Sequence, residues 1–239
     1  MTGPAPSLGP GPAAPQPCRL VILDFDGTLA DTFPWFCGVL NDVADRYGFR
    51  RVAEHETERL RGLGARAIIA HLGVPRWKLP AIARHMHGLA ARDIAQVRLF
   101  PGIDAMLAAL EAGGVPLAVV SSNTEANIRR ALGPRNAGRI GDYACGASLF
   151  GKARRLRAVI RRSGVAPGAV LSVGDEIRDA EAAAEAGCGF GAVAWGYTRA
   201  DALAALGPAH LFTAPAGIAE AVLGAARSPA APAASRESV

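Results

Sequence analysis

The sequence predicts an α/β protein built on a parallel β-sheet, with a helical segment inserted after its first strand. Along most of the chain, short apolar runs of strand length alternate with helical stretches, the pattern of a parallel sheet covered on both faces. Between residues 32 and 98 no convincing strand occurs, and the apolar residues recur at helical spacing. We therefore expect this interval to form a separate helical unit.

The expected strands are short and mostly apolar. They cover residues 20–24, 117–121, 143–146, 170–173, 191–194 and 210–212. Helices are expected between them, with glycines such as Gly133 and Gly187 at their ends. These helices cover residues 102–112, 125–132, 153–162, 178–186, 200–206 and 217–226. In the helical insertion, one face is marked by Trp35, Val39, Val43 and Tyr47.

Length and composition limit the classes of protein that fit. A chain of 239 residues, half of them apolar, is long enough for one domain and an inserted module. The net charge is +5 and the arginines are scattered without an aromatic-interleaved basic strip, which argues against a nucleic-acid partner. A mildly positive field favours phosphorylated substrates.

Cysteines and terminal segments indicate a cytoplasmic protein. The four cysteines lie far apart and show no metal-binding spacing, as expected of reduced thiols: Cys18, Cys37, Cys145 and Cys188. Residues 1–17 are rich in Pro, Gly and Ala, carry no charge, and lack the apolar run of a secretory signal or a membrane span. We expect disordered tails at residues 1–17 and 228–239, and no membrane partner.

Two carboxylates, Asp24 and Asp26, follow the first apolar run, and Gly27 and Thr28 come directly after them. Ligands of open α/β sheets bind outside the carboxyl ends of the strands, so both acids are expected over a site. Residues two apart in an extended chain share a face. One carboxylate is suited to attack an electrophile and hold a cation, and the other to move a proton. The alternative is an ordinary turn, where Asp and Gly are frequent.

Polar residues also follow the second strand, and a lysine stands before a later helix. Ser121, Ser122 and Asn123 precede a helix whose free N–H groups suit an anion, although a simple helix cap is the alternative. Lys152 begins an amphipathic helix in a chain whose only other lysine is Lys78. Such a lysine supplies a compact point charge where arginine would place a planar fork, unless it is merely solvated.

A further pair of acids, Asp175 and Asp179, follows the strand at residues 170–173. They are one helical turn apart, so we expect them on one helix face. Mg²⁺ prefers oxygen ligands and usually takes one or two protein carboxylates, so this pair is suited to hold Mg²⁺.

These four segments, in this order, resemble the motifs of the haloacid dehalogenase (HAD) superfamily, most of whose members are magnesium-dependent phosphatases. The resemblance extends from Arg19 to Leu223, and Trp195-Gly196-Tyr197 also resembles phosphoglycolate phosphatase-like members. It implies a Rossmann-like three-layer core of residues 18–31 and 99–227. It also implies an α-helical cap of residues 32–98 that closes over the active site.

The resemblance implies a Mg²⁺-dependent phosphomonoester hydrolase that forms an aspartyl phosphate. Asp24 would attack phosphorus, Asp26 would act as acid and base, and Lys152 would stabilise the charge. The implied phosphate-binding residues are Gly27, Thr28, Ser121, Ser122 and Asn123. The implied metal site comprises Asp24, Asp26, Asp175 and Asp179. The substrate would be a small phosphorylated metabolite, such as phosphoglycolate, a sugar phosphate or a nucleotide, and the enzyme a monomer or homodimer.

In similar capped enzymes a loop of the cap reaches the leaving group. The glycine-broken segment around residues 60–66 makes Arg61 and Arg66 the candidates for substrate specificity here, against the alternative of solvated arginines. His85 and His87 cannot face the same way on one helix, so a joint metal role is not expected.

Three other functions fit parts of the pattern. A dehalogenase would use the same nucleophile, but members of that type lack the second acid, which is present here as Asp26. A phosphomutase differs only in the acceptor of the phosphoryl group. A catalytically silent phosphate-binding module would have no need to keep Asp24, Asp26, Lys152 and Asp175 together.

Overall fold

Six parallel strands form one sheet in the order β3-β2-β1-β4-β5-β6 in the computed structural model, which describes residues 17–146 and 151–227. The strands are β1 (Leu20–Leu23), β2 (Leu117–Val120), β3 (Asp142–Ala144), β4 (Val170–Gly174), β5 (Gly189–Val193) and β6 (His210–Phe212). All six predicted strands are confirmed, with ends that differ by up to two residues.

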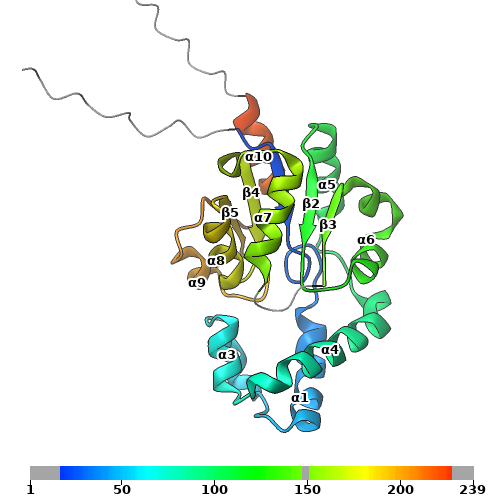
Figure 1. Cartoon of the computed structure of the whole chain (residues 1–239), viewed down its shortest axis with the longest axis vertical. Coiled ribbons are helices and arrows are strands. Elements are labelled where there is room, and N and C mark those ends of the chain that lie inside the picture. The colour runs from blue at the N-terminus through cyan, green and yellow to red at the C-terminus, as the bar shows by residue number, and fades with distance from the viewer. Residues whose placement is uncertain (1–16, 147–150, 228–239) are drawn as a thin grey trace, which may run out of the picture.

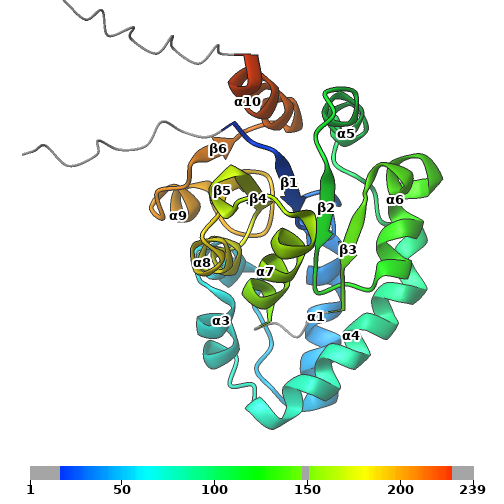
Figure 2. The same cartoon turned by 45° about the horizontal axis from the view of Figure 1, so that its top comes forward.

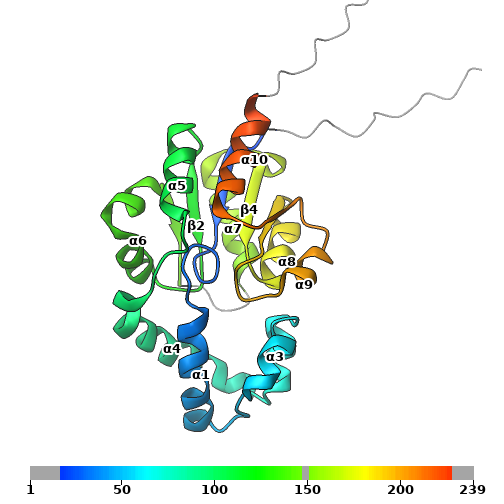
Figure 3. The ribbon, with the colours of Figure 1, turned by 180° about the vertical axis from the view of Figure 1, so that it is seen from behind.

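Helices cover both faces of the sheet, which confirms the three-layer α/β fold class. One face packs against α5 (Ile103–Ala112), α6 (Glu125–Arg139) and α10 (Pro215–Arg227) (Figure 3). The other packs against α7 (Lys152–Ser163) and α8 (Ile177–Ala186), while α9 (Ala200–Ala204) lies beside β5 and β6 (Figure 1). Strand β1 is buried on both sides because Val21 and Leu23 face the first layer, and Leu20 and Ile22 face the second.

Helix α6 differs from the prediction, which ended it at residue 132. Gly133 does leave the helical conformation, with φ 70° and ψ 167°, but helical turns resume and continue to Arg139. Pro134 is compatible with a new helical turn here, because backbone N–H groups in the first turn of a helix make no hydrogen bond within the helix and proline lacks this group. The sequence signals for a stop were therefore signals for a kink.

Residues 32–98 form helices joined by loops and contain no strand, as predicted. They contain α1 (Phe33–Tyr47), α2 (Thr57–Leu60), α3 (Ala65–His71), α4 (Leu79–Asp93) and single 3₁₀ turns at Glu54–Glu56, Arg76–Lys78 and Ile94–Gln96. The predicted face of α1 meets α4: the Trp35 indole donates to Asp93 at 3.0 Å, and the Tyr47 hydroxyl donates to the Ala81 carbonyl at 3.3 Å. Lys78 donates from Nζ to the carbonyl of Tyr47 at 2.5 Å. We keep the name cap for this unit.

The cap lies against the carboxyl ends of the strands, while β1 begins and α10 ends at the opposite end of the molecule (Figures 1 and 2). The chain leaves β1 for β2 on one side of the sheet, and β4 lies on the other side, so the strand order reverses between β1 and β4. Such a switch point is where open α/β sheets bind their ligands. The fold thus places the site at the ends of β1 and β4, under the cap.

The predicted tails, residues 1–17 and 228–239, lie outside the described residues except for residue 17. Within the described part of the chain, no helix combines the length and apolar character needed to cross a membrane.

Candidate active site

Asp24 stands directly after β1, at the switch point, with only 3 % of its surface exposed. Its backbone N–H still donates to the Val173 carbonyl of β4 at 2.9 Å, so the neighbouring strand fixes its position. Oδ1 accepts a hydrogen bond from the N–H of Phe25 at 2.8 Å, and Oδ2 lies 2.6 Å from the Lys152 ammonium. Lys152 reaches Asp24 from the first position of α7.

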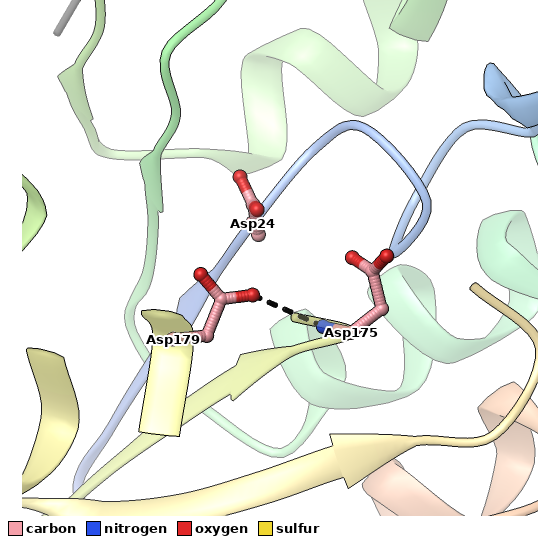
Figure 4. A group of neighbouring side chains, drawn as sticks. All are labelled: Asp24, Asp175 and Asp179. Carbon is pink, nitrogen blue, oxygen red and sulfur yellow. Dashed lines mark hydrogen bonds between the residues drawn. The ribbon is translucent and has the colours of Figure 1, made fainter. Parts of the chain in front are cut away.

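The Lys152 ammonium also pairs with a second acid, Asp179 in the first turn of α8. The distance from Nζ of Lys152 to Oδ1 of Asp179 is 2.6 Å. Oδ2 of Asp179 accepts from the backbone N–H groups of Asp175 at 3.1 Å and Glu176 at 3.0 Å, the first of which Figure 4 shows. We predicted Asp175 and Asp179 on one helix face, but α8 begins at Ile177, so Asp175 precedes the helix. The two side chains still meet because Asp179 caps the loop that carries Asp175.

Asp175 is fully buried, and both its oxygens are held. Oδ1 accepts from the Thr28 hydroxyl at 2.7 Å, and Oδ2 accepts from the N–H of Tyr197 at 2.8 Å. Two glycines pack closely against Asp175. A Cβ added to Gly27 would lie 2.2 Å from Oδ2 of Asp175, and a Cβ added to Gly196 would lie 2.2 Å from the Cβ of Asp175. Gly27 also has φ +76°, which glycine adopts without strain.

These contacts define roles that the sequence did not reveal. Thr28 and Gly27, which we predicted to bind phosphate, position Asp175. Gly196 and Tyr197 do the same from the loop after β5, a segment to which the resemblance assigned no role. The one available signal was a glycine between two aromatic residues at the end of a predicted strand.

The three acids Asp24, Asp175 and Asp179 have the geometry and the charge to hold a cation (Figure 4). Each offers an oxygen, and these oxygens all lie within 4.8 Å of one another. Three carboxylates and one ammonium leave two negative charges in a buried space, which a divalent cation would balance. Oxygen donors of this kind suit Mg²⁺. The residues present therefore fit the metal that the family resemblance implies, although the Asp26 carboxylate is not part of this group.

The protonation of these groups follows from burial and from their neighbours. Burial raises the pKa of Asp24, and the nearby Lys152 opposes the rise. Burial, with Glu176 and Asp179, raises the pKa of Asp175 well above its ordinary value. Burial lowers the pKa of Lys152, but Asp179 and Asp24 outweigh it and raise the pKa overall. The lysine is thus held charged, and a bound cation would hold the acids ionised.

Asp26 does not belong to the group formed by Asp24, Asp175 and Asp179, and its carboxylate is hydrogen-bonded to Asn123 instead. The amide nitrogen of Asn123 donates to both carboxylate oxygens of Asp26 at 3.3 Å, while its oxygen accepts from the Thr124 N–H at 2.8 Å and from Asn127 at 3.0 Å. Burial and the charge of Asp24 raise the pKa of Asp26 to about 6, a value suited to proton transfer near neutral pH. Asn123, which we predicted to bind phosphate, has its amide committed to orienting Asp26.

The other predicted phosphate ligands lie where β2 ends. Ser121 is buried, and its Oγ accepts from the N–H of Asn123 at 3.1 Å. Ser122 follows it and is half-buried. The structure therefore gathers the residues of all four motifs at adjacent strand ends, since β2, β1 and β4 are neighbours in the sheet.

Arg61 does not present a free guanidinium to the site. Its Nε donates to the Tyr197 carbonyl at 2.9 Å, and its terminal nitrogens donate to the Gly196 carbonyl at 3.0 Å and to Glu58 at 2.8 Å. The group also lies over the Phe33 ring, 5.0 Å from its centre. We call these contacts between the cap and the loop of residues 196–197 the Arg61 latch. Arg66 instead lines a cavity at the boundary between cap and core, and His85 packs on Tyr47 within the cap.

Comparison with known proteins identifies the family. Residues 21–193 match the haloacid dehalogenase-like hydrolase family, so the chain belongs to it. The chain is 31 % identical over 205 residues to phosphoglycolate phosphatase of Synechococcus elongatus, covering 85 % of this chain and 97 % of that one. Family and relative together confirm the expected enzyme class, a phosphatase.

Other similarities are narrower. Tyrosine-protein kinase PtkA of Mycobacterium tuberculosis is 32 % identical over 198 residues, but the chain spans only 64 % of its length. A crystal structure of a predicted phosphatase from Clostridium acetobutylicum superimposes with a TM-score of 0.74 at 14 % identity, covering 87 % of this chain and all of that one. This likeness establishes the shared fold.

Arg61→Ala should open the boundary between cap and core. The change removes charged hydrogen bonds to the Gly196 and Tyr197 carbonyls, and we expect phosphatase kcat/KM to fall about tenfold. Hydrogen exchange of the amides in residues 195–199 should quicken at the same time. Arg51→Ala is the matched control, because Arg51 is an exposed cap arginine paired with Asp45. Unchanged exchange in the Arg61 variant would show that the latch does not hold the cap.

Proposed function

We propose that this protein is a Mg²⁺-dependent phosphomonoester hydrolase that forms an aspartyl phosphate on Asp24. The observation that carries the proposal is that the buried carboxylate of Asp24 pairs with an ammonium and belongs to a group of three carboxylates that could hold a cation. Phosphoryl transfer depends on positioning the reacting groups and on stabilising the charge of the phosphoryl oxygens. Lys152 from α7, Asp179 from α8, and the acids that follow β1 and β4 support this reading.

Asp24, Asp175 and Asp179 would hold Mg²⁺, which when bound supplies positive charge to the phosphoryl oxygens and neutralises the acids. An oxygen of Asp24 attacks phosphorus, and the bond from phosphorus to the leaving oxygen breaks. Lys152 keeps Asp24 ionised and stabilises the phosphoryl oxygens from one side. The hydroxyl of Ser121, at the end of β2, also binds these oxygens.

Asp26 supplies the proton of the first step and removes one in the second. Held by Asn123 and with its pKa near 6, it gives its proton to the leaving alcohol. As a carboxylate it then accepts a proton from the water that attacks the phosphorus of the aspartyl phosphate. Phosphate leaves, and Asp24 and Asp26 return to their starting states.

The substrate is a small phosphorylated metabolite, and 2-phosphoglycolate is the first to test. Support comes from the Synechococcus elongatus relative, a phosphoglycolate phosphatase that aligns over 97 % of its length. The cap that closes on the site limits the size of the leaving group. A cytoplasmic location and a monomeric or homodimeric state complete the proposal.

The central test is Asp24→Asn. An amide is a very poor nucleophile, so we expect phosphate release from 2-phosphoglycolate to fall by more than about a thousandfold in folded protein. Retention of activity within tenfold, with an unchanged circular dichroism spectrum, would rule out Asp24 as the nucleophile. Failure of the wild-type protein to hydrolyse any ester in a panel would instead favour a silent phosphate-binding module.

Asp26→Asn should separate a phosphatase from a dehalogenase. An alkoxide leaving group needs a proton, whereas nitrophenolate and halide leave without one. We expect hydrolysis of ethyl phosphate to slow about a hundredfold more than hydrolysis of p-nitrophenyl phosphate. The measurement is the ratio of the two rates in variant and wild type. An unchanged ratio removes Asp26 from the acid role, and halide release from a 2-haloacid would identify a dehalogenase.

Mg²⁺ should stabilise the fold as well as support activity. At about a hundredfold excess over Kd, binding adds about 2.7 kcal/mol, which raises Tm by about 5 to 10 °C. Asp175→Asn removes one charge from the site and should abolish most of this shift and raise the Mg²⁺ concentration for half-maximal rate. Asp142→Asn, at a partly exposed acid paired with Arg162 and distant in the fold from the three acids, is the control. Equal Mg²⁺ responses in the two variants would place the metal elsewhere.

A further inference from the structure

Arg178, in the first turn of α8, is a cation at the site to which neither the motifs nor the mechanism gives a role. Its side chain is only 17 % exposed and pairs through one terminal nitrogen with Glu176. Its Nε is buried and meets no hydrogen-bond partner among the described residues. A buried N–H without a hydrogen-bond partner destabilises the folded protein. A ligand that accepts a hydrogen bond from it would therefore bind more tightly.

The guanidinium borders a small cavity at the boundary between cap and core. The cavity has a volume of about 100 Å³ and is lined by Gly64, Ala65 and Arg66 of the cap, and by Lys152, Ile177 and Arg178 of the core. Lys152 connects it to the reacting centre, because the ammonium lies 2.6 Å from Asp24. The cavity is small, so a short group fits it better than a long one.

The other cations at this boundary already have their partners. Lys152 is shared by Asp24 and Asp179, and the Arg61 latch occupies the Arg61 guanidinium. Arg66, on the cap side of the cavity, also makes an interaction of its own. Arg178 is thus a cation with a buried donor still to be satisfied, and it lines the same cavity as Lys152.

Acidic residues limit which anion fits. Glu181 and Glu185 of α8 also line this cavity. Their charges repel anions, and they disfavour a dianion more than a monoanion. Of two anionic groups that reach Arg178, a carboxylate is therefore favoured over a second phosphate. Arginine also matches carboxylate geometry, because its planar fork can donate two parallel hydrogen bonds.

We propose that Arg178 determines substrate specificity by binding a carboxylate on a short leaving group. The inference rests on the proposed phosphatase function and deepens it: the substrate class is a phosphate ester of a small hydroxy acid. The Nε–H of Arg178 donates to the carboxylate, and Nη2, which gives one hydrogen to Glu176, donates its other hydrogen beside it. The residue that recognises the leaving group is therefore Arg178 of the core, and not Arg61 of the cap.

The test compares kcat/KM for three esters in wild type and in Arg178→Gln, with Mg²⁺ present. The esters are 2-phosphoglycolate, the uncharged ethyl phosphate and ethane-1,2-diol bisphosphate. We expect the variant to lose about tenfold to a hundredfold on 2-phosphoglycolate, through KM, with ethyl phosphate within about twofold. Wild type should prefer 2-phosphoglycolate over the bisphosphate. A greater Arg178-dependent loss on the bisphosphate would show that the site binds a second phosphate and would overturn the carboxylate assignment.

Companion variants separate specificity from folding. Because Arg178→Gln leaves Glu176 without its partner, the double variant E176Q/R178Q removes the pair together and should show the same selective loss. Arg178→Lys keeps the charge but not the fork and should recover only part of it. Arg162→Gln, at an exposed arginine paired with Asp142, is the control. Equal losses on 2-phosphoglycolate and ethyl phosphate would make Arg178 merely structural and overturn the inference, as would a selective loss in Arg66→Gln alone.

A binding measurement keeps this inference distinct from the proposed function. Titration calorimetry in an Asp24→Asn background, with Mg²⁺, measures Kd for 2-phosphoglycolate and ethyl phosphate without turnover. Tighter binding of 2-phosphoglycolate that Arg178→Gln abolishes supports the inference even if wild type hydrolyses neither ester. Equal affinities for the two ligands, alongside active wild type, would retain the phosphatase and overturn the role of Arg178.

Discussion

The carboxyl end of the sheet depends on one buried ammonium. Lys152 lies 2.6 Å from both Asp24 and Asp179, and all three side chains are nearly inaccessible to water. Charges buried in this way are tolerated only when paired, so β1, α7 and α8 must approach one another for the acids to remain ionised. A compact point charge can serve two acids at such close range, which explains a lysine in a chain otherwise rich in arginine.

The cap and the cation site are linked through the same short loop. The N–H of Tyr197 holds Asp175, while the carbonyls of Gly196 and Tyr197 receive Arg61 from the cap. The Tyr197 ring adds contacts to Phe33, at 5.0 Å between ring centres, and to Phe36, at 5.6 Å. Movement of the cap therefore acts on the peptide groups that orient Asp175, and order at the cation site should favour a closed cap.

The sequence predicted the features that local pattern encodes. Buried strands are apolar runs, and acids that follow them lie at the carboxyl ends of the strands. Sequence alone therefore located Asp24, Asp26, Asp175 and Asp179. Contacts between distant segments left no local pattern. Nothing near Asn123 indicates that its amide faces Asp26, and nothing near Arg61 indicates that it binds carbonyls after β5. Gly133 was misinterpreted because a kink and a helix end use the same residues.

The scarcity of lysine has a practical consequence for watching the cap move. The chain has two side-chain amines, and one of them, Lys152, is buried among acids. The other, Lys78, is half-buried and stands on the cap just before α4. Amine-reactive dyes should therefore modify Lys78, besides the terminal amine, without any engineered handle. A fluorophore there would report the position of the cap relative to the core in the otherwise natural protein.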